Sequence, residues 1–422
     1  MARATRNILA GPRGALVLVG PGVLVAATGV GAGDLATAAF AGSRLGLAVL
    51  WAVVVGALVK FVLNEQLARW QLATGSTILE GAVARLGPIV WLVFGAYLIF
   101  WSPFVAVALM KACGAVLHAM APAIPPRAGA IGCSLAGLAL VWLGGFALFQ
   151  RVMAACIAVM FAVVVVSAVA AAPAPLDVAS GLVPRMPASA DALGWTIALV
   201  GGVGGTLTII CYGYWMREVG RAGPAELRTC RIDLAIGYTM TAIFGIGMVV
   251  LAAGLVRDGA LQGRGSALIV AIADRVGDAA HPAMRWAFLV GALGAVFSSV
   301  LGVWQAVPYV FADWWAMRGA PNTGRERAEV STKSRTYRGY LVALAVGPIA
   351  LLYLRFETAQ KLYGLVGAAF IPLLAIALVP LMNRRRWIGS ALANRWASNI
   401  ALGLALLVCM VAAVQAIAGQ FA

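Results

Sequence analysis

Charged residues and histidine are scarce in this chain of 422 residues. Only 11% of the residues are Asp, Glu, Lys or Arg, and His occurs twice, whereas 63% are hydrophobic. Soluble domains average about 25% charged and about 45–50% apolar residues, so a soluble fold is excluded. Because a membrane span needs about 20 mostly apolar residues, the composition predicts an all-α integral membrane protein with little chain left for a water-facing domain.

Motifs of enzymes and of stable metal centres are also missing. The six cysteines form no CxxC pair and lie mostly in apolar runs, where a free thiol behaves as a small hydrophobe. His118 and His281 stand far apart, and the chain has no phosphate-binding glycine loop, zinc motif or nucleophile triad. We therefore predict no disulfide framework, no cofactor and no enzymatic activity.

The excess of basic residues has a membrane explanation. Lys and Arg number 31 against 15 acidic residues, which gives a formal charge of +16. These cations sit in short gaps between apolar runs and do not form a basic face on a soluble module. The lipid bilayer is therefore the expected partner, nucleic acid is not, and we expect a monomer.

Eleven apolar runs bounded by charges or by Pro and Gly predict eleven membrane-spanning helices. They cover residues 15–42, 45–70, 88–120, 129–149, 152–172, 191–216, 232–256, 284–316, 338–354, 361–381 and 397–417. Pro21 and Gly22 interrupt the first run, so we expect a retained helix rather than a cleaved leader. Residues 265–277 have the apolar spacing of a surface helix, although a partly ordered loop is the equal alternative.

The distribution of Lys and Arg predicts the topology. When the loops are assigned alternately to two sides, about twenty basic residues fall on the side of the N-terminus and about nine on the other. Cytoplasmic loops are richer in Lys and Arg, so the N-terminus is predicted in the cytoplasm and the C-terminus outside. We expect the location to be a bacterial inner membrane.

Two of the runs contain helix breakers near their middle. The first contains Gly29, Gly31 and Gly33, and the sixth contains the sequence Gly-Gly-Val-Gly-Gly-Thr over residues 201–206. Unwound backbone inside a membrane is tolerated where it lines a cavity or packs on protein. Interruptions at matching positions of two halves are typical of inverted-repeat transporters with a midplane site. The alternative is that these glycines only allow close helix packing.

Asp34 is the most informative single residue. A carboxylate at mid-membrane depth is costly and by default functional, as a cation ligand or a proton carrier. The alternative is a structural salt bridge with Lys60 or Lys111. Around it we predict a substrate site made of Gly31, Gly33, Asp34, Gly204, Gly205, Thr206 and Thr208, with Asp34 and Gly31 as metal ligands.

Five further residues are assigned structural or gating roles. Glu65 and Arg69 are spaced for an i, i+4 ion pair, and Lys60 requires a buried partner that the sequence does not specify. Tyr212 and Trp304 are aromatic candidates for a vestibule, although such residues more often serve packing.

Several motifs resemble the Nramp family of proton-coupled divalent metal transporters. The first run carries GPG at 20–22 and then GAGDLAT at 31–37, which is similar to the family's GPG, DPGN and A-T pattern. The second run is similar to the family's A-R-L-G, T-G and L-A-E stretch, and the eighth to its A-G-Q-S-S signature. The matching residues there are Ala68, Arg69, Thr74, Gly75, Glu80, Ala295, Ser298, Ser299, Ala306 and Val310. The resemblance implies a LeuT-type fold with two inverted five-helix repeats, at 15–172 and 191–382, and an eleventh helix at 397–417.

The departures from the family pattern suggest a change of cargo. Gly31 stands at the family's Asp position, Asp34 at its Asn position, and Ile209 at its His position, while no Met remains near Thr206 and Thr208. Oxygen ligands alone suit a hard ion such as magnesium better than manganese or iron. The third run also lacks the acidic residues that carry protons in the family. We therefore predict a secondary transporter of a divalent cation, with protons as a candidate symported ion, or alternatively a transporter of a small organic solute such as an amino acid or amine.

Overall fold

Helices form every regular element in the part of the chain that the computed structural model describes, which is residues 20–170, 173–187, 192–257, 267–279, 281–318 and 330–418. The α-helices are α1 (Pro21–Gly29), α2 (Ala38–Leu45), α3 (Leu50–Thr74), α4 (Ile78–Leu86), α5 (Pro88–Met120), α6 (Pro126–Ala170), α7 (Pro175–Gly181), α8 (Ala192–Gly202), α9 (Cys211–Glu218), α10 (Leu227–Arg257), α11 (Ala267–Ala279), α12 (Pro282–Ala316), α13 (Arg335–Val346), α14 (Phe356–Ala368), α15 (Phe370–Asn383), α16 (Arg385–Ile388) and α17 (Trp396–Ala418). Shorter elements are the π-helix η3 (Val30–Thr37) and the 3-10 helices η4 (Gly46–Val49), η5 (Leu207–Ile210), η6 (Pro224–Glu226) and η7 (Gly347–Leu351).

Each of the eleven predicted runs contains helix. The fourth and fifth runs join in α6, which kinks at Gly145, where φ is 64°. The tenth run divides between α14 and α15, and the ninth comprises α13 and η7. Among the described residues, seven helical stretches are long and apolar enough to cross a membrane. This number is smaller than the eleven predicted runs because some adjacent runs merge and others fall short of full length. The segment predicted at 265–277 is helical from Ala267 as α11, which confirms the helix rather than the loop, while residues 265 and 266 lie outside the described residues. Its position on the membrane surface stays a prediction.

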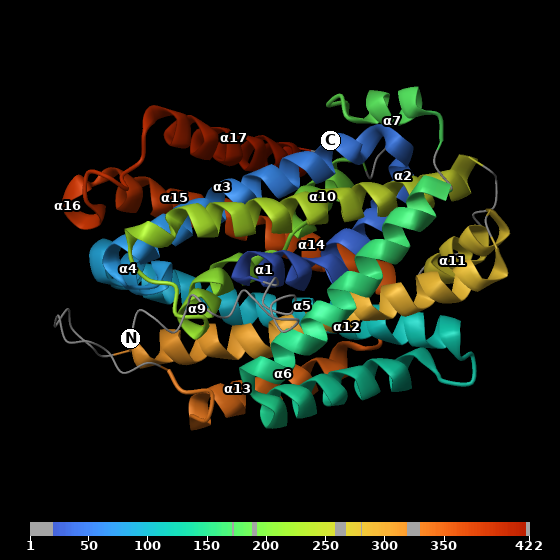
Figure 1. Cartoon of the computed structure of the whole chain (residues 1–422), viewed down its shortest axis with the longest axis horizontal. Helices are drawn as coiled ribbons and strands as arrows, with labels where there is room; N and C mark the ends of the chain where they lie inside the picture. The colour runs from blue at the N-terminus through green and yellow to red at the C-terminus, as the bar shows by residue number, and fades with distance from the viewer. Residues whose placement is uncertain are drawn as a thin grey trace, which may run out of the picture.

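The bundle is apolar outside and contains polar groups inside, the arrangement expected in a membrane. Large apolar side chains such as Leu143, Leu176 and Val169 are more than 70% exposed, whereas Asp34 and Lys60 are fully buried. The long helices pack around α1: α10 contacts α1 and α3, and α12 contacts α1 and α5 (Figure 1). Every residue of α1 is buried. The chain is thus an integral membrane protein whose first helix forms the centre.

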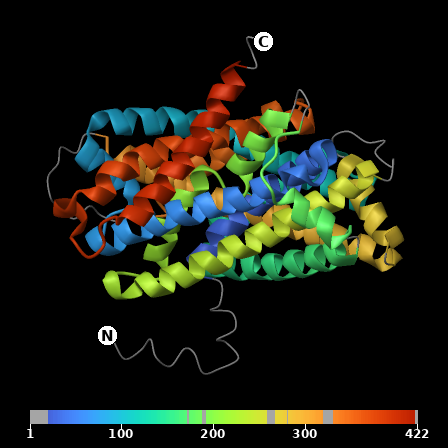
Figure 2. The ribbon, with the colours of Figure 1, turned by 90° about the horizontal axis from the view of Figure 1, so that it is seen from above.

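The two ends of the bundle are distinct. Helices α11 and α16 lie at opposite ends in both views (Figure 1 and Figure 2). The predicted topology also assigned these two segments to opposite sides of the membrane. Which end faces the cytoplasm stays a prediction.

Candidate functional site

The interruption in the first run is a π-helix rather than an unwound gap. Residues Val30–Thr37 keep a helical backbone with wider turns, so the prediction of unwinding is wrong for this run. The physical reason is a partner on α12: the Gly31 N–H donates to Ser299 Oγ at 2.7 Å. Ser299 Oγ in turn donates to the carbonyl oxygen of Ala27, 3.1 Å away. Polar groups displaced from the α-helical pattern are therefore satisfied without opening the helix.

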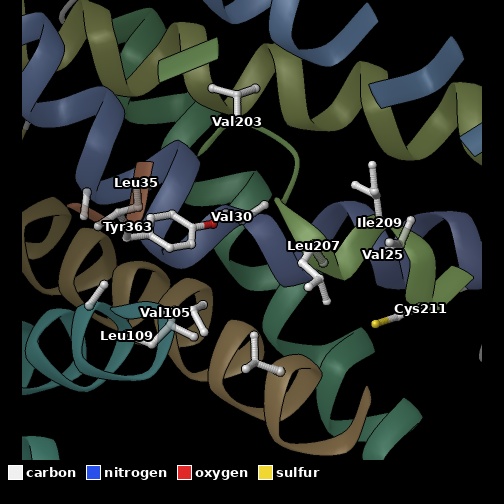
Figure 3. Close-up of a cluster of buried hydrophobic side chains, with 14 of the residues drawn as sticks. Val25, Val30, Leu35, Val105, Leu109, Val203, Leu207, Ile209, Cys211 and Tyr363 are labelled. Atoms are coloured by element: carbon white, nitrogen blue, oxygen red, sulfur yellow. The ribbon is translucent and has the colours of Figure 1, made fainter. Parts of the chain in front are cut away.

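The interruption in the sixth run is a true break. Helix α8 ends at Gly202, and η5 begins at Leu207. Gly204 and Gly205 have φ values of 70° and 95°, a backbone conformation that favours glycine. Figure 3 shows this thin stretch of chain between Val203 and Leu207 beside the helix that carries Val30 and Leu35. The prediction of local unwinding is confirmed here.

The two interruptions touch each other through glycines. A Cβ atom added at Gly29 would lie 2.0 Å from the backbone nitrogen of Gly205, and one added at Gly33 would lie 2.1 Å from the carbonyl oxygen of Gly202. Close packing, the alternative weighed for these clusters, is therefore a real function of Gly29 and Gly33. This close packing occurs together with the break and places the broken segment of the sixth run against the first run.

Asp34 joins the two interruptions. Its carboxylate accepts from the Gly204 N–H, at 3.2 Å to Oδ1 and 3.4 Å to Oδ2. The side chain is fully buried, and the Lys60 ammonium is close enough to attract it electrostatically. Lys111, the other candidate partner, instead donates to the carbonyl oxygen of Leu352 at 2.9 Å.

The partners of Lys60 answer the question that the sequence left open. Its Nζ donates to the carbonyl oxygens of Val200, Gly201 and Val203 at 2.7, 3.1 and 2.8 Å. These are carbonyls at the C-terminal end of α8, which lack intrahelical partners because the helix stops there. An ammonium group at a helix C-terminus is also favoured by the helix dipole.

Further polar residues, which the sequence did not identify, surround the break in the sixth run. Asn64 lies one helical turn after Lys60 on α3, and its amide donates to the hydroxyl of Tyr238 on α10. Among the described atoms, Asn64 Oδ1 and Thr241 Oγ1 are buried without a hydrogen-bond partner. Tyr238 and Thr241 both lie close to Gly204. The i, i+4 spacing of Lys60 and Asn64 was the one sequence signal that could have identified this wall.

The atoms around the break that could bind a cation are oxygens, and one carboxylate is among them. Thr206 and Thr208 are buried at the break, and Tyr363 lies close to Asp34 and Thr206. A role of the two threonines in binding substrate stays a prediction. No group of three or more His, Cys, Asp or Glu that could hold a metal ion occurs within the described ranges. Carbonyl, hydroxyl, amide and carboxylate oxygens suit hard cations, whereas soft transition metals prefer sulfur and nitrogen.

The predicted gating residues separate into two groups. Arg69 and Glu65 form the expected i, i+4 pair at 2.9 Å, and Arg231 contacts the same carboxylate at 2.7 Å. Arg69 also donates to the carbonyl oxygen of Leu392 at 3.1 Å, which ties α3 to the segment after α16.

Tyr212 and Trp304 are fully buried packing residues in this structure. Trp304 lies close to Gly137 on α6. A packing role, rather than a position in a vestibule, fits both side chains. A role in gating stays a prediction for all five residues.

Comparisons with solved structures find the same fold. The chain superimposes on a manganese transporter of Eremococcus coleocola crystallised with an aromatic bis-isothiourea compound, with a TM-score of 0.70 and 16% identity over 97% of this chain and 88% of that one. It also resembles MhsT in complex with L-phenylalanine, with a TM-score of 0.63 and 15% identity over 94% and 98% of the chains. Mhp1, a nucleobase-cation-symport-1 family transporter with bromovinylhydantoin bound, gives 0.55 and 15% over 94% and 92%. No curated protein sequence matches.

These structures share the LeuT-type architecture, which the chain therefore adopts: two inverted five-helix repeats and an eleventh helix. The repeat boundaries at 15–172 and 191–382 stay a prediction. Residues 22–419 match the family described as natural resistance-associated macrophage protein-like. That match spans nearly the whole chain, in agreement with the motifs quoted above. The protein belongs to the Nramp family.

Proposed function

We propose that this protein is a secondary transporter that moves a hard divalent cation such as magnesium by alternating access. The observation that carries the proposal is Asp34, a fully buried carboxylate that binds the broken end of α8 from a π-helix in the first run. A buried acid that contacts a broken helix inside a membrane is typical of an ion pathway. Family membership supports metal as the cargo, and an Nramp-fold neighbour is itself a manganese transporter.

Asp34 would be the charged ligand, and neighbouring oxygens would complete the shell. The Thr206 and Thr208 hydroxyls and the backbone carbonyls of Gly31, Gly204 and Gly205 are the nearest candidates by position, and Gly33 supplies the close helix contact. A magnesium ion keeps several of its waters and is bound through one or two carboxylates, so a single acid suffices. Asp34 is also the acid that would take up a proton if transport is coupled to protons.

Alternating access would open and close one ion pair at each end of the site, and each pair is called a layer below. At one end, Arg221 pairs with Asp233 at 2.6 Å, and the same carboxylate accepts from the Gly22 N–H at 2.8 Å. At the other end, Arg44 pairs with Glu357 between α2 and α14. The site is buried between these layers. By the topology inferred above, the first layer faces the cytoplasm of a bacterial inner membrane.

Uptake into liposomes tests the assignment. Wild-type protein should move magnesium, and Asp34→Asn and Asp34→Ala should abolish uptake and binding, because either change removes the one charged ligand. Asp274→Asn is the matched control, since that carboxylate pairs with Arg285 at the surface, away from the break. Unchanged transport and binding of every divalent ion tested in Asp34→Ala would show that the site assignment is wrong.

The alternative cargo is a small organic solute, and two observations favour it. The Lys60 ammonium lies near enough to interact with Asp34 electrostatically, and its positive charge weakens the attraction of this site for a divalent ion. The second half-helix also begins at η5, and the N–H groups at a helix start are of the kind that bind carboxylates. Thermal stabilisation of purified protein by amino acids or amines, with no stabilisation by magnesium or manganese, would establish this alternative.

A further inference from the structure

The C-terminal end of α8 has the form of an occupied cation site. Three backbone carbonyl oxygens, of Val200, Gly201 and Val203, converge within 2.7–3.1 Å on one atom, Lys60 Nζ. The lysine comes from a different helix, α3, and is fully buried. The Asp34 carboxyl group lies near enough to interact with this ammonium group electrostatically. Nothing in the sequence near residue 60 predicts this contact, because the carbonyls lie about 140 residues further along the chain.

The same arrangement of oxygens would hold a small monovalent cation. Unwound carbonyls at the C-terminal ends of broken helices coordinate sodium ions in transporters built from inverted repeats. Here an ammonium group, which also carries one positive charge, takes that position and satisfies the carbonyls. A buried cation is costly at this depth, and it is tolerated because each of the three carbonyl oxygens that it contacts carries a partial negative charge.

We propose that Lys60 is a tethered cation that permanently fills a monovalent cation site formed by the end of α8. The intact protein therefore binds no sodium ion at this position. Removal of the ammonium group uncovers a site for sodium or for a small primary ammonium ion. A purely structural lysine would leave no such site behind, because its loss would merely create a void.

Thermal unfolding of the full-length protein in detergent tests the proposal without a transport assay. Wild type, Lys60→Ala and the matched control Lys111→Ala are compared in choline, sodium and methylammonium chloride at equal ionic strength. Lys111 is a suitable control because its Nζ also donates to a backbone carbonyl, that of Leu352, away from the break. A ligand that binds only the folded state raises the unfolding temperature as its concentration rises.

We expect Lys60→Ala to unfold well below wild type in choline and to recover saturably in sodium or methylammonium. Wild type and Lys111→Ala should show no difference between the three salts. Lys60→Met, which keeps the length of the side chain but not its charge, should show the same salt dependence more weakly and serves if Lys60→Ala cannot be purified in choline.

Three outcomes would overturn the proposal. The first is that the Lys60 variants unfold identically in all three salts. The second is a sodium-specific stabilisation of wild type, because the site would then be vacant in the intact protein. The third is failure of both variants to fold in any of the salts, since an added cation should replace the missing ammonium group.

The consequence for transport rests on the proposed function. Uptake of the divalent ion by wild type should not change when external sodium is replaced by choline, whereas uptake by Lys60→Ala should require sodium or methylammonium. The two hypotheses fail separately. Salt-specific stabilisation of Lys60→Ala without any divalent uptake would contradict only the proposed cargo, and uptake without salt-specific stabilisation would contradict only the role of Lys60.

Discussion

Replacement of Gly33 by alanine tests the contact between the two interruptions. A Cβ atom at this position would lie 2.1 Å from the carbonyl oxygen of Gly202 and 2.6 Å from its carbonyl carbon. Both are backbone atoms and cannot rotate away, so the π-helix and the end of α8 must separate by about 1.3 Å to reach ordinary van der Waals contact at 3.4 Å. Overpacking of this kind costs about 1–3 kcal/mol. The better helix propensity of alanine recovers at most about 1 kcal/mol.

The same displacement should disturb the site. The Gly204 N–H lies 3.2 Å from Asp34 Oδ1, close to the limit of a hydrogen bond, so a shift of this size would break the contact. We therefore expect Gly33→Ala to unfold at a lower temperature and to lose most uptake. Gly132→Ala on α6 is the control, because a Cβ atom there meets nothing within 4 Å. The reasoning is refuted if both variants unfold at the wild-type temperature and transport equally well.

Two further substitutions test the groups that hold the first run in place. Ser299→Ala leaves the Gly31 N–H buried without an acceptor and should destabilise the protein by about 1–3 kcal/mol in chemical unfolding. Ser298→Ala should cost less, because that hydroxyl donates to a carbonyl oxygen of its own helix, that of Ala295. Asp233→Ala removes the acceptor at the start of α1 and should cost about 1.5–3 kcal/mol. In Asp274→Ala, which breaks an exposed pair, the loss should stay below about 1 kcal/mol, and equal losses in the two aspartate variants would contradict the assignment.

The sequence alone was sufficient to locate the helical runs, the sixth-run break and the buried acid Asp34. Hydropathy is a local property, so the apolar runs correspond to helices from α1 to α17. The glycines at 204 and 205 require no partner to disfavour a helix, which is why the break was predictable. The isolated charge of Asp34 in an apolar run indicated function by itself. The motifs of the Nramp family added the fold.

Only the tertiary structure decided what the polar groups of the site contact. The first run stays helical because Ser299, 268 residues away from Gly31, accepts its N–H. Lys60 finds three carbonyls on α8, and Asn64 finds Tyr238 on α10. Hydrogen bonds and close glycine contacts between distant helices depend on how the helices are oriented, and local propensity contains no information about that orientation. The sequence therefore determined where the apolar helices lie along the chain, whereas packing determined which polar group contacts which.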